Sequence, residues 1–272
     1  YQLGSVQEVG NIYPKYYLKA FYDGMTAEGD TMPISLIRSA WAGSAKYGAL
    51  VWSGDIVSTF ECFRRQVQAG LNMAIAGIPW WTTDIGGFHG ARTDDPDFHR
   101  LYIRWFEYGC FCPVMRLHGN RNPQEGYGAE QIGSGSDNEI WSFGDKAYEI
   151  SKKYIFLRER LRDYIRTQMK KAHEDGTPMM RPVFYDFPTD QESWNVEDAY
   201  LFGPDLYVAP VMEDHVTERE VYLPDGTAWF NAWTGEKYEG GQNVTVAAPL
   251  DTIPVFVKEG ADAEKLLNIF SE

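Results

Sequence analysis

The chain has 272 residues, of which 44% are hydrophobic and 15% aromatic, and this composition excludes a disordered polypeptide. Its formal net charge of −14 argues against nucleic acid and anionic membranes as partners. No apolar run reaches the length of about 18 residues that a membrane helix needs, so we expect no membrane span.

Strand-like apolar runs alternate with helical patterns over the first two thirds of the chain. In chain order, the patterns predict a helix over 11–29, strands over 34–41 and 48–55, a helix after the capping-box spacing at 58–61, a strand over 72–81, a helix from Asp97 and a long helix over 145–175. This alternation predicts parallel strands joined by crossover helices, the arrangement of α/β folds.

The sequence pattern changes near residue 185. From there on, short runs of β-branched and aromatic residues are separated by residues typical of turns. This pattern predicts an antiparallel β-sheet or β-sandwich. We place the boundary at Phe187-Pro188, which divides the chain into 1–187 and 188–272. Residues 260–272 are expected to form a short terminal helix or an irregular end.

Polar residues follow the apolar runs at three places in the first domain, at Arg38, Asp55 and Asp84. In a (β/α)8 barrel the carboxyl ends of the strands carry the catalytic side chains. Glycoside hydrolysis needs one carboxylic acid to protonate the leaving oxygen and a second carboxylate opposite it. Asp55 is our candidate acid. Asp84 could contact substrate or only brace a loop, and Arg38 could contact substrate or form a buried ion pair.

Aromatic residues and one histidine accompany these polar residues. Trp80, Trp81 and Phe88 offer apolar faces on which a sugar ring could stack. Trp52 and Trp81 could be pocket walls or core residues, and His118 could donate to a sugar hydroxyl or be a core histidine. Because neighbours in a strand face opposite sides, Trp81 and the preceding Trp80 must point in different directions, and the sequence leaves open which faces a pocket.

The three cysteines, Cys62, Cys110 and Cys112, follow no disulfide framework and no zinc-binding spacing. We therefore expect no metal site, and we expect Cys110 and Cys112 to be buried packing residues. The first ten residues lack the basic and apolar regions of a signal peptide.

Together these segments resemble glycoside hydrolase family 31 over nearly the whole chain. The family's Trp-x-Gly-Asp motif matches residues 52–55, and this match places Asp55 17 residues after Arg38. The family's Asp-Ile-Gly-Gly-Phe and Met-Arg-x-His segments match residues 84–88 and 115–118. The resemblance identifies Asp55 as the general acid/base. It also implies the C-terminal half of a (β/α)8 barrel, with 178–188 as the last barrel strand, followed by the family's β-domain.

The amino-acid sequences of these motifs most resemble those of bacterial α-xylosidases. This resemblance implies a retaining enzyme that releases a terminal α-linked sugar, with xylose favoured over glucose. The implied partner is an oligosaccharide or α-glycoside, no cofactor is needed, and the bacterial cytoplasm is the expected location. The family's nucleophile motif is absent from residues 1–37, so we expect the chain to need a missing N-terminal half.

Two other readings stay open at this point. The chain could be a non-catalytic carbohydrate-binding fragment, or the same scaffold could act as a transglycosidase or lyase. The sequence leaves open the linkage, the leaving group and the oligomeric state.

Overall fold

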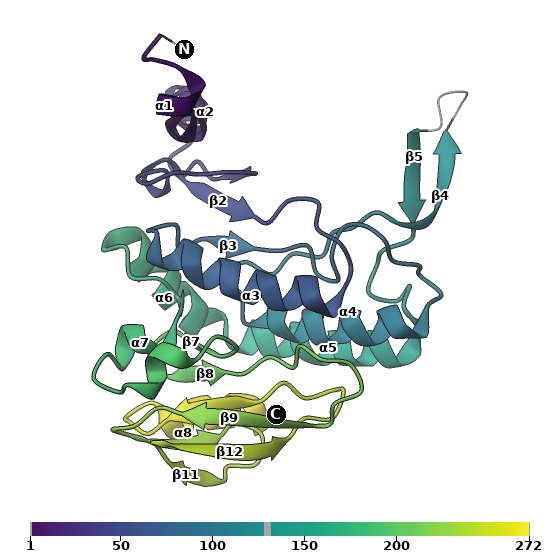
Figure 1. The fold of residues 1–272 in the computed structure, drawn as a ribbon, viewed down its shortest axis with the longest axis vertical. Coiled ribbons are helices and arrows are strands. Elements are labelled where there is room, and N and C mark those ends of the chain that lie inside the picture. The colour runs from purple at the N-terminus through teal and green to yellow at the C-terminus, as the bar shows by residue number, and fades with distance from the viewer. Residues whose placement is uncertain (1, 128–131, 272) are drawn as a thin grey trace.

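The computed structural model describes residues 2–127 and 132–271, arranged as a partial barrel above an antiparallel β-domain (Figure 1). The barrel part contains strands β1 (Ser35–Ile37), β2 (Ala49–Trp52) and β3 (Trp81–Thr82), and helices α1 (Val6–Val9), α2 (Tyr13–Ala27), α3 (Phe60–Ile75), α4 (Pro96–Cys110), α5 (Gly144–Arg160) and α6 (Arg162–Glu174). Two short 3₁₀ segments, Gly10–Ile12 and Ala45–Tyr47, lie between them.

The three barrel strands form a parallel sheet in the order β1-β2-β3. Ile37 lies opposite Val51, and Val51 lies opposite Trp81, so the carboxyl ends of the strands are aligned. Parallel strands need crossover connections, and α3 supplies the one between β2 and β3. The expected α/β arrangement of a partial barrel is confirmed.

Helix α3 is longer than the sequence predicted, and β3 is shorter. The N-cap of α3 is Thr59, whose hydroxyl accepts a hydrogen bond from the Cys62 amide. The Ser58 hydroxyl accepts a hydrogen bond from Arg121 instead. The helix extends to Ile75, which makes the first part of the predicted strand over 72–81 helical. An apolar run of this kind fits a buried helix end as well as a buried strand, which is why periodicity misplaced the boundary.

The predicted helix over 145–175 is interrupted at Leu161, which separates α5 from α6. Leu161 is fully buried, and its amide still bonds to the Leu157 carbonyl. The apolar spacing therefore continues across the interruption, and no glycine or proline marks it in the sequence. Helix α4, which precedes α5 along the chain, begins after Asp95, whose side chain accepts from the Asp97 amide.

The C-terminal domain is built from antiparallel strands. These are β6 (Met180–Arg181), β7 (Tyr200–Phe202), β8 (Leu206–Val208), β9 (Glu218–Leu223), β10 (Ala228–Asn231), β11 (Lys237–Glu239), β12 (Gln242–Ala247) and β13 (Val255–Lys258), with the short helix α7 (Val183–Asp186), a 3₁₀ segment at Glu192–Asn195 and the terminal helix α8 (Ala263–Ser271). Six strands form one sheet in the order β11-β10-β13-β8-β7-β6, and β12 pairs with β9 in a separate ribbon. The expected antiparallel β-domain is confirmed, and residues 260–272 contain a helix.

The inner strands β7, β8 and β13 of the six-stranded sheet are buried on both faces, whereas the edge strand β11 is largely exposed. Tyr207 and Phe256 pack with the β9–β12 ribbon in one apolar cluster, while Val208 and Val255, which point the other way, join the core formed with the barrel helices. Successive strand residues face opposite sides, so a sheet covered twice must be apolar at every position. This explains the short uninterrupted apolar runs in the sequence.

Residues 178–188 do not form a barrel strand. Met180 and Arg181 pair antiparallel with Phe202 and Leu201 at the edge of the C-terminal sheet, and the residues that follow form α7. The sheet thus begins before the predicted boundary at 187/188. A second unpredicted element is the hairpin of β4 (Arg121–Tyr127) and β5 (Ile132–Ser136), which stands out from the packed body of the molecule (Figure 1).

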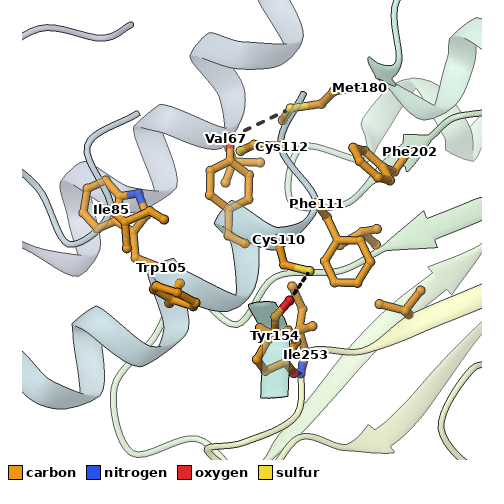
Figure 2. Packing of buried hydrophobic residues seen from close by; sticks show 14 of the residues in the cluster. Val67, Ile85, Trp105, Cys110, Phe111, Cys112, Tyr154, Met180, Phe202 and Ile253 are labelled. Atoms are coloured by element: carbon orange, nitrogen blue, oxygen red, sulfur yellow. Dashed lines mark hydrogen bonds between the residues drawn. The ribbon is translucent and has the colours of Figure 1, made fainter. Parts of the chain in front are cut away.

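One core joins the two parts of the chain (Figure 2). Phe63 of α3 stacks on Trp105 of α4 at 4.9 Å between ring centres. Cys110 donates to the Tyr154 carbonyl, and the Tyr154 hydroxyl accepts from the Ile253 amide of the C-terminal part (Figure 2). The three cysteines are free, and Cys110 and Cys112 are buried as expected. Within residues 2–127 and 132–271, no helix has both the length and the apolar character that a membrane crossing requires.

Candidate active site

The residues that the sequence singled out at strand ends lie together at one edge of the barrel sheet. Arg38 directly follows β1, Asp55 follows β2 after two small residues, and Asp84 follows β3. Because the three strands are parallel and aligned, their carboxyl ends meet at this edge. The motif spacing and the sheet register therefore converge on one site.

Asp55 and Arg38 form an ion pair at this edge. A terminal nitrogen of Arg38 donates to Asp55 Oδ2 at 3.0 Å. The Asp55 side chain is 42% exposed and that of Arg38 is 66% exposed. Arg38 is therefore not a buried structural cation, and the Asp55 carboxyl group has open surface at which it could exchange a proton with a bound molecule.

Trp52, the last residue of β2, has cation–π contacts with two guanidinium groups. The guanidinium carbon of Arg38 is 5.6 Å from the Trp52 ring centre, and that of Arg116 is 5.9 Å away. Cations are attracted to the electron-rich face of an indole. The half-buried Trp52 ring thus contacts both the Asp55 partner and a residue from the loop after α4.

Asp84 is fully buried, and its carboxylate accepts a hydrogen bond from Arg116. Its second oxygen, Oδ2, has no hydrogen-bond partner among the described residues. Of the two roles that the sequence left open, bracing and direct substrate contact, this burial supports bracing. The loop that follows is held close to α3, since a Cβ at Gly87 would lie 2.8 Å from the Ser58 Cα.

The side chain of His118 is exposed, so His118 is not a core histidine. Its ring centre lies 5.4 Å from that of Phe88, which itself contacts His89 at 4.4 Å. Partial burial, and next the positive charge of Arg116, lower the pKa of His118, while the negative charge of Asp55 raises it. His118 thus responds to both charged groups of the site.

Trp81 lies in the hydrophobic core, with a side chain that is only 4% exposed. Its ring approaches α3 closely enough that a Cβ at Gly70 would collide with it at 2.7 Å. Trp80 is the half-buried member of the pair. The predicted split between the two tryptophans therefore holds, but Trp81, which we expected at a pocket wall, has almost no free surface on which a sugar could stack.

Two arginines that support the site were not among the predicted site residues. Arg116 sits inside the Met-Arg-x-His segment, so the motif contained it without indicating a role. Arg121 is fully buried, and burial lowers its pKa to about 10. It donates to the Ile85 and Gly87 carbonyls, to Ser58 Oγ and to Asn138 Oδ1. Nothing in the local sequence signals this role, because all four partners are distant along the chain.

The described residues contain no group of three or more histidine, cysteine or acidic side chains that could hold a metal ion. The site contains the partly exposed Asp55 carboxyl group, its partner Arg38, the Trp52 ring and the exposed His118. Such a set can exchange protons and donate hydrogen bonds to hydroxyl groups, as acid/base catalysis on a sugar requires.

Two family models match the chain in succession. The TIM-barrel domain of glycosyl hydrolases family 31 matches residues 2–168, and the C-terminal domain of the same family matches residues 176–261. Both models agree with the partial barrel and the antiparallel β-domain seen in the structure.

Individual relatives point to the same family. An α-xylosidase of Saccharolobus solfataricus is 38% identical over 260 residues, which cover 96% of this chain and 34% of the relative. The crystal structure of a family 31 α-xylosidase from a soil metagenome, complexed with xylose, is 54% identical with a TM-score of 0.95, and the match covers 98% of this chain and 40% of that one. A xylosidase from Aspergillus niger is 35% identical with a TM-score of 0.84, over 96% of this chain and 39% of that one.

The chain thus spans between a third and two fifths of the length of these relatives. Within that span, the strand-end cluster, the fold and both family models agree. This chain belongs to glycoside hydrolase family 31.

Proposed function

We propose that this chain supplies the acid/base side of the active site of a retaining α-glycoside hydrolase that releases a terminal α-linked sugar. The observation that carries the proposal is the partly exposed Asp55 carboxyl group at the end of β2, paired with Arg38 at 3.0 Å. Its position at the carboxyl edge of a parallel barrel sheet is where such enzymes hold their catalytic groups.

In the proposed reaction, a second carboxylate from outside this chain attacks the anomeric carbon, and Asp55 gives its proton to the departing glycosidic oxygen. The carbon–oxygen bond breaks, and a covalent glycosyl-enzyme forms. Asp55, now ionised, takes a proton from water, and the resulting hydroxide displaces the enzyme carboxylate from the anomeric carbon. Two displacements at one carbon return the original α configuration.

Arg38 and His118 are the residues that we expect to bind the sugar bound next to Asp55. Both are exposed at the same edge of the sheet, and both carry donors that match hydroxyl groups. Phe88, beside His118, offers a ring edge or face to the sugar. No organic cofactor takes part in these steps.

We favour xylose over glucose as the released sugar. Support comes from the relatives, since the three similar proteins described above are named as α-xylosidases or as a xylosidase, and one of them was crystallised with xylose. An α-glucosidase of Bacillus thermoamyloliquefaciens is 34% identical over 94% of this chain, so glucose is the competing sugar to test.

The test is the Asp55→Ala variant of the complete enzyme that carries this chain, assayed on aryl α-xylosides and α-glucosides. We expect hydrolysis of substrates with poor leaving groups to fall by about 10²–10⁴-fold, while substrates with good leaving groups keep most of the first step. Added azide should restore turnover and give an α-glycosyl azide, because a small anion can attack the β-linked glycosyl-enzyme without a base and this second displacement returns the α configuration.

The matched control is Asp198→Ala. Asp198 pairs with Arg219 in the β-domain and its side chain is 51% exposed, so it is an arginine-paired aspartate of similar exposure far along the chain from the motifs. This control should retain wild-type kinetics. Wild-type kinetics in Asp55→Ala itself would refute the assignment, and would leave a carbohydrate-binding role for the site.

A further inference from the structure

Arg116 connects a buried anion to the open edge of the site. Its guanidinium donates to the Asp84 carboxylate, which has no exposed surface, while the Arg116 side chain itself is 23% exposed. A buried carboxylate is costly unless a cation accompanies it. Asp84 therefore holds Arg116 firmly in one place, at the point where the loop after α4 approaches the end of β3.

Trp52 is the residue that Arg116 and Arg38 share. Their guanidinium carbons lie 5.9 Å and 5.6 Å from the same ring centre. Among the described residues, no hydrogen bond or ion pair joins Arg116 directly to Arg38 or to Asp55. The Trp52 ring is therefore the shared contact through which we expect Arg116 to act on the Arg38–Asp55 pair.

We propose that Arg116, anchored by the buried Asp84, is a positioning residue that fixes the Trp52 ring and thereby holds Arg38 in place against Asp55. This inference rests on the proposed function for Asp55. It extends that function to Arg116 and Asp84, which contact neither the Asp55 carboxyl group nor Arg38. The long, exposed side chain of Arg38 has many rotamers, and contact with a fixed ring restricts them.

The arrangement gives the buried Asp84 carboxylate a cation of its own. Arg116 balances its negative charge and at the same time contacts the Trp52 ring. These two contacts explain why an arginine serves here. A lysine could pair with Asp84, but it lacks the planar group that can bind a carboxylate and lie against a ring at the same time.

The test uses Arg116→Met in the complete enzyme, compared on two substrates of the same sugar. If Arg116 positions the acid, kcat should fall on the order of tenfold for an alkyl α-glycoside, whose leaving oxygen needs a proton. The fall should be within about twofold for a glycosyl fluoride, which needs far less acid assistance. A purely structural role would lower both rates equally, through a smaller folded fraction. Arg116→Lys should give an intermediate loss on the alkyl glycoside.

A double-mutant cycle identifies the route. In a Trp52→Leu background, Arg116→Met should have little further effect on the alkyl glycoside, because the shared ring is already gone. Additive losses from Trp52→Leu and Arg116→Met would overturn the proposal, as would equal losses on the two substrates.

Failure of the inference and failure of the proposed function can be told apart. Asp55→Ala tests the function alone, since it should show the same leaving-group dependence in a stronger form. A crystal structure of Arg116→Met gives a readout that does not depend on activity. Displaced Trp52 and Arg38 side chains would support the positioning role, and unchanged side chains would overturn it even if Asp55 proved not to be the acid.

Discussion

The contact between α4 and the β-domain depends on one buried arginine. Arg104 is 2% exposed and lies next to the fully buried Glu107 on the same helix. Its guanidinium donates to Glu107 Oε2 at 3.1 Å and to four carbonyl oxygens of the β-domain, those of Val216 (3.1 Å), Ala248 (2.6 Å), Pro249 (3.0 Å) and Thr252 (3.2 Å). We predict that Arg104→Met strongly destabilises the junction of the two domains.

The magnitude follows from what the substitution leaves behind. Removing one partner of a buried ion pair costs about 3–5 kcal/mol when the other charge stays buried without compensation, and less when the remaining carboxyl group takes up a proton. Arg104→Met/Glu107→Leu removes that stranded carboxylate and should recover part of the loss. The Pro249 carbonyl would still accept from the Thr252 amide, whereas the other three carbonyls would lose their arginine donor, so a deficit of about 1–3 kcal/mol should persist.

The loss should also depend on pH. Burial raises the pKa of Glu107, whereas Arg104 lowers it, so Arg104→Met should raise it further. A folded-state pKa above that of the unfolded chain means that the folded protein holds a proton which the unfolded chain releases. Stability then falls as pH rises, until the folded carboxyl group itself ionises. The destabilisation caused by Arg104→Met should therefore be larger at pH 8 than at pH 6.

The assay is urea unfolding of the wild-type protein, the single variant and the double variant at both pH values, followed by tryptophan fluorescence. The reasoning would be refuted by a loss below about 1 kcal/mol in Arg104→Met, since the pair and the carbonyl contacts would then contribute little. An identical loss at the two pH values, or a double variant less stable than the single one, would equally contradict it.

Two further predictions concern the site loops. Arg121→Met should cost about 2–4 kcal/mol and speed amide hydrogen exchange in the loop after β3, because two buried carbonyls and two partly buried side-chain acceptors lose their donor. Unchanged exchange in this loop would show that Arg121 does not hold it in place. In NMR titration, Arg116→Met should raise the pKa of His118 and Asp55→Asn should lower it, since each change removes the opposing charge, and shifts in the other direction would rule out this account of His118.

Much of the site could be read from the chain itself. Asp55 and Arg38 follow strands that have a clear apolar pattern, and the parallel arrangement then brings them to one edge. The alternation with helices favours parallel strands, and once β1, β2 and β3 are neighbours in one sheet, their aligned ends bring Arg38 and Asp55 to the same edge. The role of Asp55 as acid/base remains a proposal that the kinetic test must decide.

Residues whose roles depend on distant partners could not be read in this way. Asp84 looked equally suited to contact substrate or to brace a loop until its burial and its pairing with Arg116 were known. Trp81 matched a sugar-stacking residue by type and position, yet it packs on α3. Arg121 carried no signal, because its partners come from three separate loops.

The same division applies to the fold. The sequence by itself determined the alternation of strands and helices in the first domain, the change from a parallel to an antiparallel part and the motifs at the strand ends, because these depend on local periodicity and turn residues. It did not predict the β4–β5 hairpin. Only the tertiary structure decided that Met180 and Arg181 join the C-terminal sheet, that α3 continues to Ile75, and that Asp84 and Trp81 turn inward. Short apolar segments fit several partners equally well, and the partner that covers each face is chosen by packing across the whole molecule.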